Sequence, residues 1–254
     1  MKIRILGCNG GVGDGSGTTS ILINEHILID CGTGIASMTL AEMAQIRHIF
    51  LTHSHLDHLA GIPFLVDTLF GVINEPILIY GSSVTLAALQ QHIFNWVIWP
   101  DFAVLPSLEN PIMGYRLMEC DSAVQIDAVE ITSVGMNHVV PTCGYLVKAD
   151  QRLFAFSGDT TTTDHFWDVL NQQAGVDLLV VETAFTDADL ELCHRAKHYC
   201  PTLLAADLQR LRHPCAVHLT HAKPGEREHI CAEITALVTD RQIIPLLGGE
   251  IFEI

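Results

Sequence analysis

The chain of 254 residues is 49% hydrophobic, which is enough to bury a large core as one α/β domain or two tightly joined halves, and which excludes a disordered protein. Its 13 Lys and Arg residues stand against 29 Asp and Glu residues, and the net charge of -16 disfavours long nucleic acid as a partner unless a local patch reverses it. The eight cysteines form no C-x-x-C pair, so we expect reduced core residues and a cytoplasmic protein. Because the N-terminus lacks a signal-peptide pattern and no apolar run approaches membrane-spanning length, we expect a soluble protein without membrane contact.

The first predicted strand, residues 3–7, leads into a glycine-rich run over residues 10–17. This run does not fit the G-x-G-x-x-G pattern of a phosphate-binding loop, and residues 19–24 after it read as a strand rather than a helix. We therefore interpret it as a hairpin connection and not as a cofactor loop. A further buried strand over residues 26–31 carries Asp30 near its end, where the side chain either orients a neighbouring loop or caps the local turn.

Three histidines and an aspartate follow directly after the apolar run of residues 49–51, namely His53, His55, Asp57 and His58. In an extended chain residues two apart share a side, so the first three can point one way while the last faces elsewhere as a helix starts. The arrangement suits two adjacent metals, with His53 and His55 for the first and the Asp-His pair for the second. The alternative is a solvated polar turn, which is disfavoured because packing gives no reason for so many imidazoles after a strand.

The rest of the chain alternates predicted helices and strands. The helices cover residues 37–45, 59–70, 83–91, 164–171, 187–196, 202–211 and 226–238. The strands cover residues 77–81, 129–134, 144–147, 153–156, 178–181, 216–219 and 243–247. Each half contains strands and helices in a weakly similar pattern, and no low-complexity linker separates the halves. We therefore predict one domain over residues 1–254, with pseudo-repeat halves of about 1–123 and 124–254. Two sheets would pack face to face with helices outside both, which makes a four-layer αββα sandwich of the α/β class.

An aromatic segment over residues 92–102 contains Trp96, Trp99 and Phe102 and is too aromatic for an ordinary loop. Two interpretations stay open. The segment packs as a corner of the core, or it supplies a flat apolar wall for an aromatic ligand or for the second subunit of a homodimer.

Three more polar side chains, His138, Asp159 and His221, each follow an apolar strand candidate in the second half. With the first loop they complete two metal sites, in which Asp159 bridges a set of His53, His55 and His138 and a set of Asp57, His58 and His221. Each metal then has an open position for a shared water. Surface or core roles are expected for the histidines without such a setting, namely His26, His48, His92, His213 and His229.

The motif T-H-S-H-L-D-H at residues 52–58, with the later His, Asp and His in this order, resembles the metallo-β-lactamase superfamily over the whole chain. Segments at residues 92–102, 156–164, 181–185 and 219–224 look in addition like the class II 3′,5′-cyclic-nucleotide phosphodiesterases; they read H-I-F-N-W-V-I-W-P-D-F, F-S-G-D-T-T-T-T-D, V-E-T-A-F and L-T-H-A-K-P. The resemblance implies the αββα sandwich of that superfamily, two divalent metal ions and a small phosphodiester substrate. Zinc is the expected metal, with iron or manganese as alternatives.

Residues 197–205 are similar to the region where those phosphodiesterases, and the related ribonuclease Z enzymes, carry a histidine that assists the leaving group. The resemblance implies this role for His198, although Lys197 replaces the usual small residue before it. Glu182 would hold the other nitrogen of the imidazole. Asp57, besides binding metal, would hold a proton of the bridging water, which the two metals activate for in-line attack on phosphorus.

The predicted product of 3′,5′-cAMP or 3′,5′-cGMP is the 5′-monophosphate, and the base would stack on Trp96, Trp99 and Phe102. A B1-type β-lactamase is disfavoured because the chain offers oxygen donors, Asp57 and Asp159, where such an enzyme carries a cysteine. Ribonuclease Z is disfavoured because the short interval from His138 to Asp159 leaves little room for an RNA-gripping arm. A glyoxalase-II-like thioesterase shares all seven ligands and is the runner-up, and a metal-binding sensor protein is the alternative that is not an enzyme.

Overall fold

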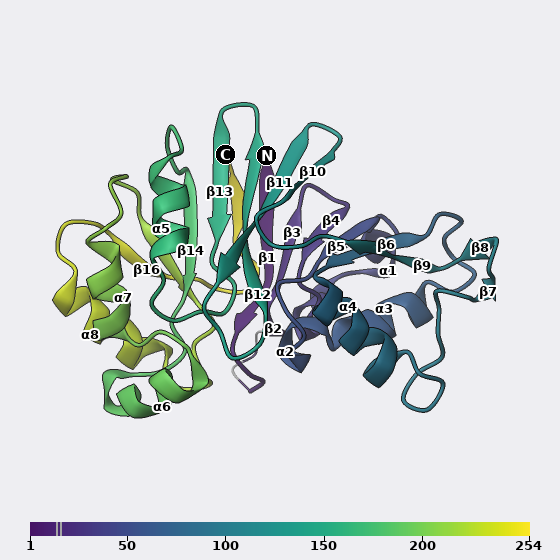
Figure 1. Cartoon of the computed structure of the whole chain (residues 1–254), viewed down its shortest axis with the longest axis horizontal. Coiled ribbons are helices and arrows are strands. Elements are labelled where there is room, and N and C mark those ends of the chain that lie inside the picture. Colours follow the sequence, from purple (N-terminus) through teal and green to yellow (C-terminus); the bar gives the residue numbers. More distant parts are fainter. Residues whose placement is uncertain (14, 16) are drawn as a thin grey trace.

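The computed structural model describes residues 1–13, 15 and 17–254, and its strands form two large sheets that lie face to face (Figure 1). The first sheet has the order β17-β1-β3-β4-β5-β6-β9, with β2 beside β1. Its strands are β1 (Lys2–Asn9), β2 (Gly17–Thr18), β3 (Ser20–Ile23), β4 (Ile27–Ile29), β5 (His48–Phe50), β6 (Ile77–Gly81), β9 (Met113–Leu117) and β17 (Ile251–Glu253). Strands thus follow the glycine-rich run, as predicted, while Asp14 and Ser16 of that run lie outside the described residues.

The second sheet has the order β10-β11-β12-β13-β14-β15-β16, antiparallel from β10 to β13 and parallel from β13 to β16. Its strands are β10 (Ala123–Ile126), β11 (Val129–Met136), β12 (Thr142–Ala149), β13 (Arg152–Phe156), β14 (Leu178–Glu182), β15 (Val217–Thr220) and β16 (Ile243–Pro245). A small separate hairpin joins β7 (Pro106–Ser107) to β8 (Asn110–Pro111).

Helices cover the outer faces of both sheets (Figure 1). The α-helices are α1 (Leu40–Met43), α2 (Leu56–Leu59), α3 (Gly61–Thr68), α4 (Ser83–Ala88), α5 (Asp164–Asn171), α6 (Leu190–Ala196), α7 (Pro201–Leu208) and α8 (Arg227–Leu237). Short turns of other helix types are η1 (Thr33–Ser37), η2 (Leu89–Ile93) and η3 (Asp187–Asp189). Within the described residues, no helix is both long and apolar enough to span a bilayer.

Three apolar clusters fill the spaces between the four layers. Neighbouring residues of one strand enter different clusters, because side chains alternate across a sheet. Ile49 faces the helices of the first half, whereas Phe50 faces the second sheet and stacks on Tyr80 at 4.3 Å between ring centroids. Leu179 and Val180 of β14 divide in the same way between the helices and the space between the sheets. The predicted αββα sandwich is therefore confirmed.

Several predicted boundaries differ from the structure for local reasons. The helix expected over residues 37–45 is split into η1 and α1, because Thr39 forms a capping box with Glu42 and starts a new helix there. The helix expected over residues 202–211 begins at Pro201, where proline fits the first turn. Strands β9 and β17 were not predicted: β17 is largely exposed and β9 buries only Met113 fully, and backbone pairing with β6 and β1 holds them in the first sheet.

The strand directions bring the polar side chains of both halves to one edge of the sandwich. Strands β11, β13, β14 and β15 run the same way, so the residues after them gather where these strands end. The amide of Cys143 at the start of β12 donates to the carbonyl of Thr52 after β5, which joins the two sheets at this edge. Just before Asp159, Gly158 has a φ of 60°, and a Cβ there would lie 2.8 Å from the carbonyl oxygen of Cys143.

Candidate metal centre

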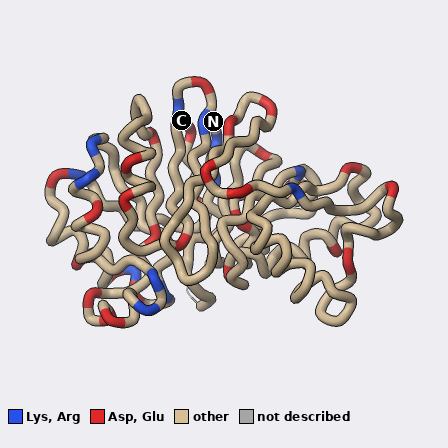
Figure 2. Tube along the Cα trace, in the orientation of Figure 1, with Lys and Arg blue, Asp and Glu red and all other residues tan. Residues whose placement is uncertain are grey.

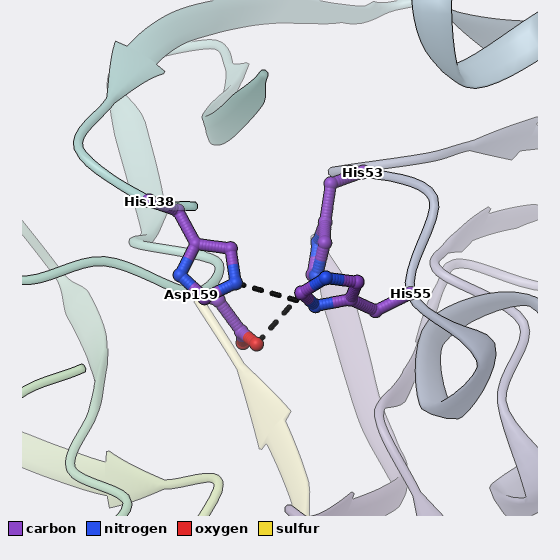
Figure 3. Close-up of side chains that lie close together, drawn as sticks. All are labelled: His53, His55, His138 and Asp159. Atoms are coloured by element: carbon purple, nitrogen blue, oxygen red, sulfur yellow. Dashed lines mark hydrogen bonds and ion pairs between the residues drawn. The ribbon is translucent and has the colours of Figure 1, made fainter. Parts of the chain in front are cut away.

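One group of possible ligands comes from both sheets: His53 and His55 follow β5, His138 follows β11 and Asp159 follows β13 (Figure 3). Their ligand atoms all lie within 4.8 Å of one another. His138 Nε2 is 3.3 Å from His55 Nδ1, and His53 Nε2 is 3.6 Å from Asp159 Oδ2. The structure thus brings together the residues predicted for the first metal.

The second group contains the three residues predicted for the second metal: Asp57, His58 and His221. His221 Nε2 lies 3.2 Å from Asp57 Oδ2 and also 3.2 Å from His58 Nε2. Two imidazole nitrogens that face each other at this distance need a proton or a cation between them, because neutral lone pairs repel.

Asp159 lies between the two groups. Its Oδ2 is 3.6 Å from His53 Nε2 and 3.3 Å from His221 Nε2, and its Oδ1 is 3.3 Å from His58 Nε2. One buried carboxylate therefore contacts histidines of both groups, which is the placement that a bridging ligand requires.

Outer contacts fix the ring orientations of the histidines. The fully buried Asp30 holds His58 Nδ1 at 2.7 Å and accepts from the backbone amide of Thr52 at 2.8 Å, so the orienting role predicted for it fits its contacts. His138 Nδ1 donates to the carbonyl oxygen of Lys197 at 2.9 Å. Both bonds direct the Nε2 lone pairs toward the cluster. Asp30 and His221 also have left-handed backbone conformations, with φ of 55° and 66°, which is a strain often stored at functional sites.

The electrostatics suit a cation. Burial lowers the pKa of His138 to about 4, and burial and the neighbouring imidazole of His58 lower the pKa of His53. Burial also disfavours charge on His58, but the carboxylates of Asp159 and Asp30 outweigh it and raise the pKa of His58 well above its usual range. The Nε2 atom of His53 is buried without a hydrogen-bond partner. The neutral imidazoles of His53 and His138 and the positive charge favoured beside Asp159 and Asp30 fit divalent metal ions, and so does the unpartnered nitrogen of His53.

His198 lies against both groups. Its ring stacks on His221 at 5.3 Å between centroids and lies 4.9 Å from the ring of His138. Its Nδ1 is 2.7 Å from Oε1 of the buried Glu182, which also accepts from the amide of Thr160 at 2.9 Å. Burial raises the pKa of Glu182 and lowers that of His198. The predicted His198-Glu182 pair is therefore present beside the ligands.

Two neighbours of His198 were not singled out from the sequence. The ring of Phe185 lies edge-on to His198 at 5.7 Å, and Lys223 Nζ lies 5.8 Å from the centroid of the Phe185 ring. Burial lowers the pKa of His198, the carboxylate of Asp159 raises it, and the charge of Lys223 lowers it further. Both residues occur in segments that carry the resemblance, V-E-T-A-F and L-T-H-A-K-P, which was the available signal.

The predicted aromatic wall is divided in the structure. Phe102 is 3% exposed and belongs to the core between the first sheet and its helices, and Trp99 packs partly buried beside Phe64 at 5.6 Å. Both agree with the interpretation as a core corner. Trp96, in contrast, is 62% exposed. Among the described residues, no hydrogen bond or ring contact joins these three aromatic residues to the predicted metal ligands.

The cysteines and the remaining histidines take no part in either group. All eight cysteines are free thiols, as expected, and the donors of both groups are nitrogen and oxygen atoms. His26 and His48 pack near Asp127 and Tyr80 away from the cluster, and His229 is exposed beside Glu226.

The chain is similar in sequence and in fold to known metal-dependent hydrolases. The family model of the beta-lactamase superfamily domain matches residues 25–242, so the chain belongs to this superfamily and is a metal-dependent hydrolase. The chain is 25% identical over 261 residues to a protein of Yersinia pestis named "Probable 3′,5′-cyclic-nucleotide phosphodiesterase", covering 83% of this chain and 72% of that protein. It is 26% identical to ribonuclease Z of Acaryochloris marina, covering 96% of this chain and 93% of that enzyme. The crystal structure of unliganded yeast PDE1 has the same fold, with a TM-score of 0.80 at 18% identity and 98% coverage of both chains.

Proposed function

We propose that the protein is a phosphodiesterase that opens 3′,5′-cyclic nucleotides to 5′-monophosphates. The observation that carries the proposal is the placement of Asp159 between two His/Asp groups, beside His198, whose Nδ1 is held by the buried Glu182. His198 could also join Asp159 and His221 around a metal ion, and we propose the acid role for it because Glu182 holds its ring. Hard oxygen donors and imidazoles suit phosphoester chemistry. The similarity to a protein named as a cyclic-nucleotide phosphodiesterase supports the same activity.

The proposed ligands of two divalent cations are His53, His55 and His138 for one, Asp57, His58 and His221 for the other, and Asp159 for both. When bound, such cations lower the pKa of a water, polarise the phosphate oxygens and offset charge in the transition state. We propose zinc, with iron or manganese as alternatives. Asp57, whose Oδ2 faces the cluster beside His221 Nε2, is the carboxylate placed to hold a proton of the attacking water.

His198 is the proposed general acid. Glu182 accepts from Nδ1, so Nε2 is the ring atom left to face the substrate. Glu182 would stabilise the protonated ring of His198 before the reaction. As the bond from phosphorus to O3′ breaks, Nε2 would give its proton to O3′ and the ring would become neutral. Lys197 occupies a left-handed position with φ of 53°, and this turn presents its carbonyl to His138 and His198 to the cluster.

Ribonuclease Z activity is the second candidate, because a relative of that name matches the chain over nearly its whole length. Two features favour a small substrate instead. The hairpin of β12 and β13 fills the interval from His138 to Asp159, and the net charge of -16 repels a polynucleotide. A glyoxalase-II-like thioesterase and a metal-binding sensor protein remain alternatives that share the ligands.

A substrate panel tests the proposal. Metal-loaded protein would be assayed with 3′,5′-cAMP, 3′,5′-cGMP, bis-p-nitrophenyl phosphate, a glutathione thioester and a precursor tRNA. We expect turnover of the cyclic nucleotides and of the aryl diester only. Hydrolysis of the thioester without any diester cleavage would favour the thioesterase, cleavage of the tRNA alone would favour ribonuclease Z, and metal binding without turnover would favour the sensor.

A further inference from the structure

A row of three side chains leads away from the proposed metal ligands: the imidazole of His198, the ring of Phe185 and the ammonium of Lys223. Lys223 is half-buried and its Nζ donates to the carbonyl oxygen of Gly10 at 2.7 Å. Its backbone amide donates to the carbonyl of Ala184 at 3.0 Å, directly before Phe185. The position of the ammonium is therefore fixed by the backbone of two other segments.

No carboxylate of the described residues forms an ion pair with the charge of Lys223. Five arginines of the chain form ion pairs with carboxylates: Arg4, Arg47, Arg152, Arg210 and Arg241. Lys223 has no carboxylate partner in the described part of the chain, although acidic residues outnumber basic ones by 29 to 13. An ammonium has three donors, and the carbonyl of Gly10 uses one of them.

A second ammonium belongs to Lys197, the residue directly before His198. Lys197 Nζ is 3.3 Å from the carbonyl oxygen of His138, and it too forms no ion pair with a carboxylate among the described residues. Figure 2 shows acidic residues spread along the trace, and basic and acidic positions close together around α6. Two ammonium groups without a carboxylate partner among the described residues, beside a site for phosphodiesters, indicate a second anionic group on the ligand.

We propose that Phe185, Lys197 and Lys223 form a subsite for an anionic group on the leaving-group side of the substrate. The inference rests on the proposed function in one respect, namely that the leaving oxygen faces His198. A substituent on that oxygen then extends past the imidazole to the Phe185 ring and the ammonium of Lys223. Besides 3′,5′-cyclic nucleotides, the site should therefore accept phosphodiesters whose leaving fragment carries a further phosphate or carboxylate, and should bind that added group more tightly than a hydroxyl.

Two nucleotides that differ by one phosphate test this subsite without turnover. In 5′-AMP the 5′-phosphate can occupy the metal site and O3′ is a hydroxyl, whereas adenosine 3′,5′-bisphosphate carries a second phosphate on O3′. Calorimetric titration of the zinc-loaded protein should give about tenfold tighter binding of the bisphosphate, since a charge-assisted hydrogen bond is stronger than a neutral one. Equal affinities, or no binding of either nucleotide, would overturn the inference.

Substitutions at Lys223 test whether its ammonium causes the tighter binding of the bisphosphate. Lys223→Met should remove most of the tenfold gain while the affinity for 5′-AMP stays the same, and Lys223→Arg should keep the gain because it keeps the charge. Lys148→Met is the matched control, because Lys148 is exposed on β12 and contacts only Gln173 through a hydrogen bond. Zinc content and the unfolding midpoint check that each variant is folded. A gain that persists in Lys223→Met would contradict the assignment.

The outcome separates this inference from the proposed function. Hydrolysis of 3′,5′-cAMP without a gain for the bisphosphate would remove the subsite and leave the activity. A Lys223-dependent gain without hydrolysis of any cyclic nucleotide would keep the subsite and refute the proposed activity.

Discussion

The two sheets contribute to the proposed metal centre in opposite ways. The first sheet supplies four of the proposed ligands from one loop of residues 53–58, which the buried Asp30 holds through Thr52 and His58. The second sheet supplies His138, Asp159 and His221 from three separate strand ends. The first contribution is therefore local and depends on one orienting carboxylate, whereas the second depends on the packing of a whole sheet with its helices.

The largest expected effect is that of removing the residue shared by both groups. Asp159→Ala should abolish binding of both metals and lower turnover by more than about a hundredfold, since even outer contacts of metal ligands are worth 10 to 100-fold. Metal analysis of the purified variant and its turnover of bis-p-nitrophenyl phosphate check this. The control is Asp164→Ala, which removes an exposed carboxylate at the start of α5. Wild-type turnover in Asp159→Ala would refute the bridging role.

The second largest loss of activity is expected when His198, the proposed general acid, is removed. His198→Ala should slow a diester with a poor leaving group by about 10² to 10⁴-fold, and should slow release of p-nitrophenolate far less because that anion needs no proton. Rates with 3′,5′-cAMP and with bis-p-nitrophenyl phosphate give the comparison. Equal losses with both substrates would deny His198 the acid role.

The local organisation of the first-sheet loop is tested by Asp30→Asn. The change removes the carboxylate that orients His58 and Thr52, so affinity for the second metal should fall by about 10 to 100-fold. Affinity for the first metal, whose ligands Asp30 does not contact, should fall less. Competition with a chelator, monitored for each equivalent, measures both. An unchanged second affinity would show that the loop does not depend on Asp30.

The dependence of the second sheet on its helices is tested by Asp207→Ala. This buried carboxylate of α7 accepts from Tyr199 Oη at 2.6 Å and from Trp167 Nε1 at 3.3 Å. Leaving these buried donors unpaired should cost about 3 kcal/mol of the free energy of unfolding. Denaturant unfolding measures the loss. A stability within about 0.5 kcal/mol of wild type would show that the contacts around Tyr199 contribute little.

The smallest effect is expected outside both regions, at Trp96. If its exposed ring stacks on the base, Trp96→Ala should raise the KM for 3′,5′-cAMP about fivefold, with stability within about 0.5 kcal/mol of wild type. If the ring belongs to a homodimer contact, the variant should dissociate instead. Kinetics and sedimentation distinguish the two interpretations, and a variant with neither change would exclude both.

The contrast between the sheets also explains what could be predicted from the sequence. Local signals sufficed for α5 and β6, whose bounds were predicted residue for residue, and for the loop after β5. The observation that His138, Asp159 and His221 each follow an apolar strand candidate predicted that they lie near the first loop, as they do in the structure; their role as metal ligands stays a prediction. The prediction of one domain with halves near 1–123 and 124–254 stays a prediction; the second sheet begins at Ala123, while β17 at the other end of the chain pairs with β1.

What the sequence could not supply depends on contacts between distant segments. Phe185 and Lys223 lie 38 positions apart and become neighbours of His198 only through the parallel pairing of β14 and β15. The burial of Phe102 and the exposure of Trp96 likewise follow from how the connection after η2 folds back on the first sheet, which residue composition does not determine.

The most direct test of the proposed dinuclear phosphodiesterase is a zinc titration of the metal-free protein with 3′,5′-cAMP as substrate and phosphorus NMR as the readout. Hydrolysis should rise to a plateau at about two equivalents of zinc, with 5′-AMP as the product. A plateau at one equivalent, a 3′-AMP product, or no hydrolysis at any zinc content would contradict the proposed activity.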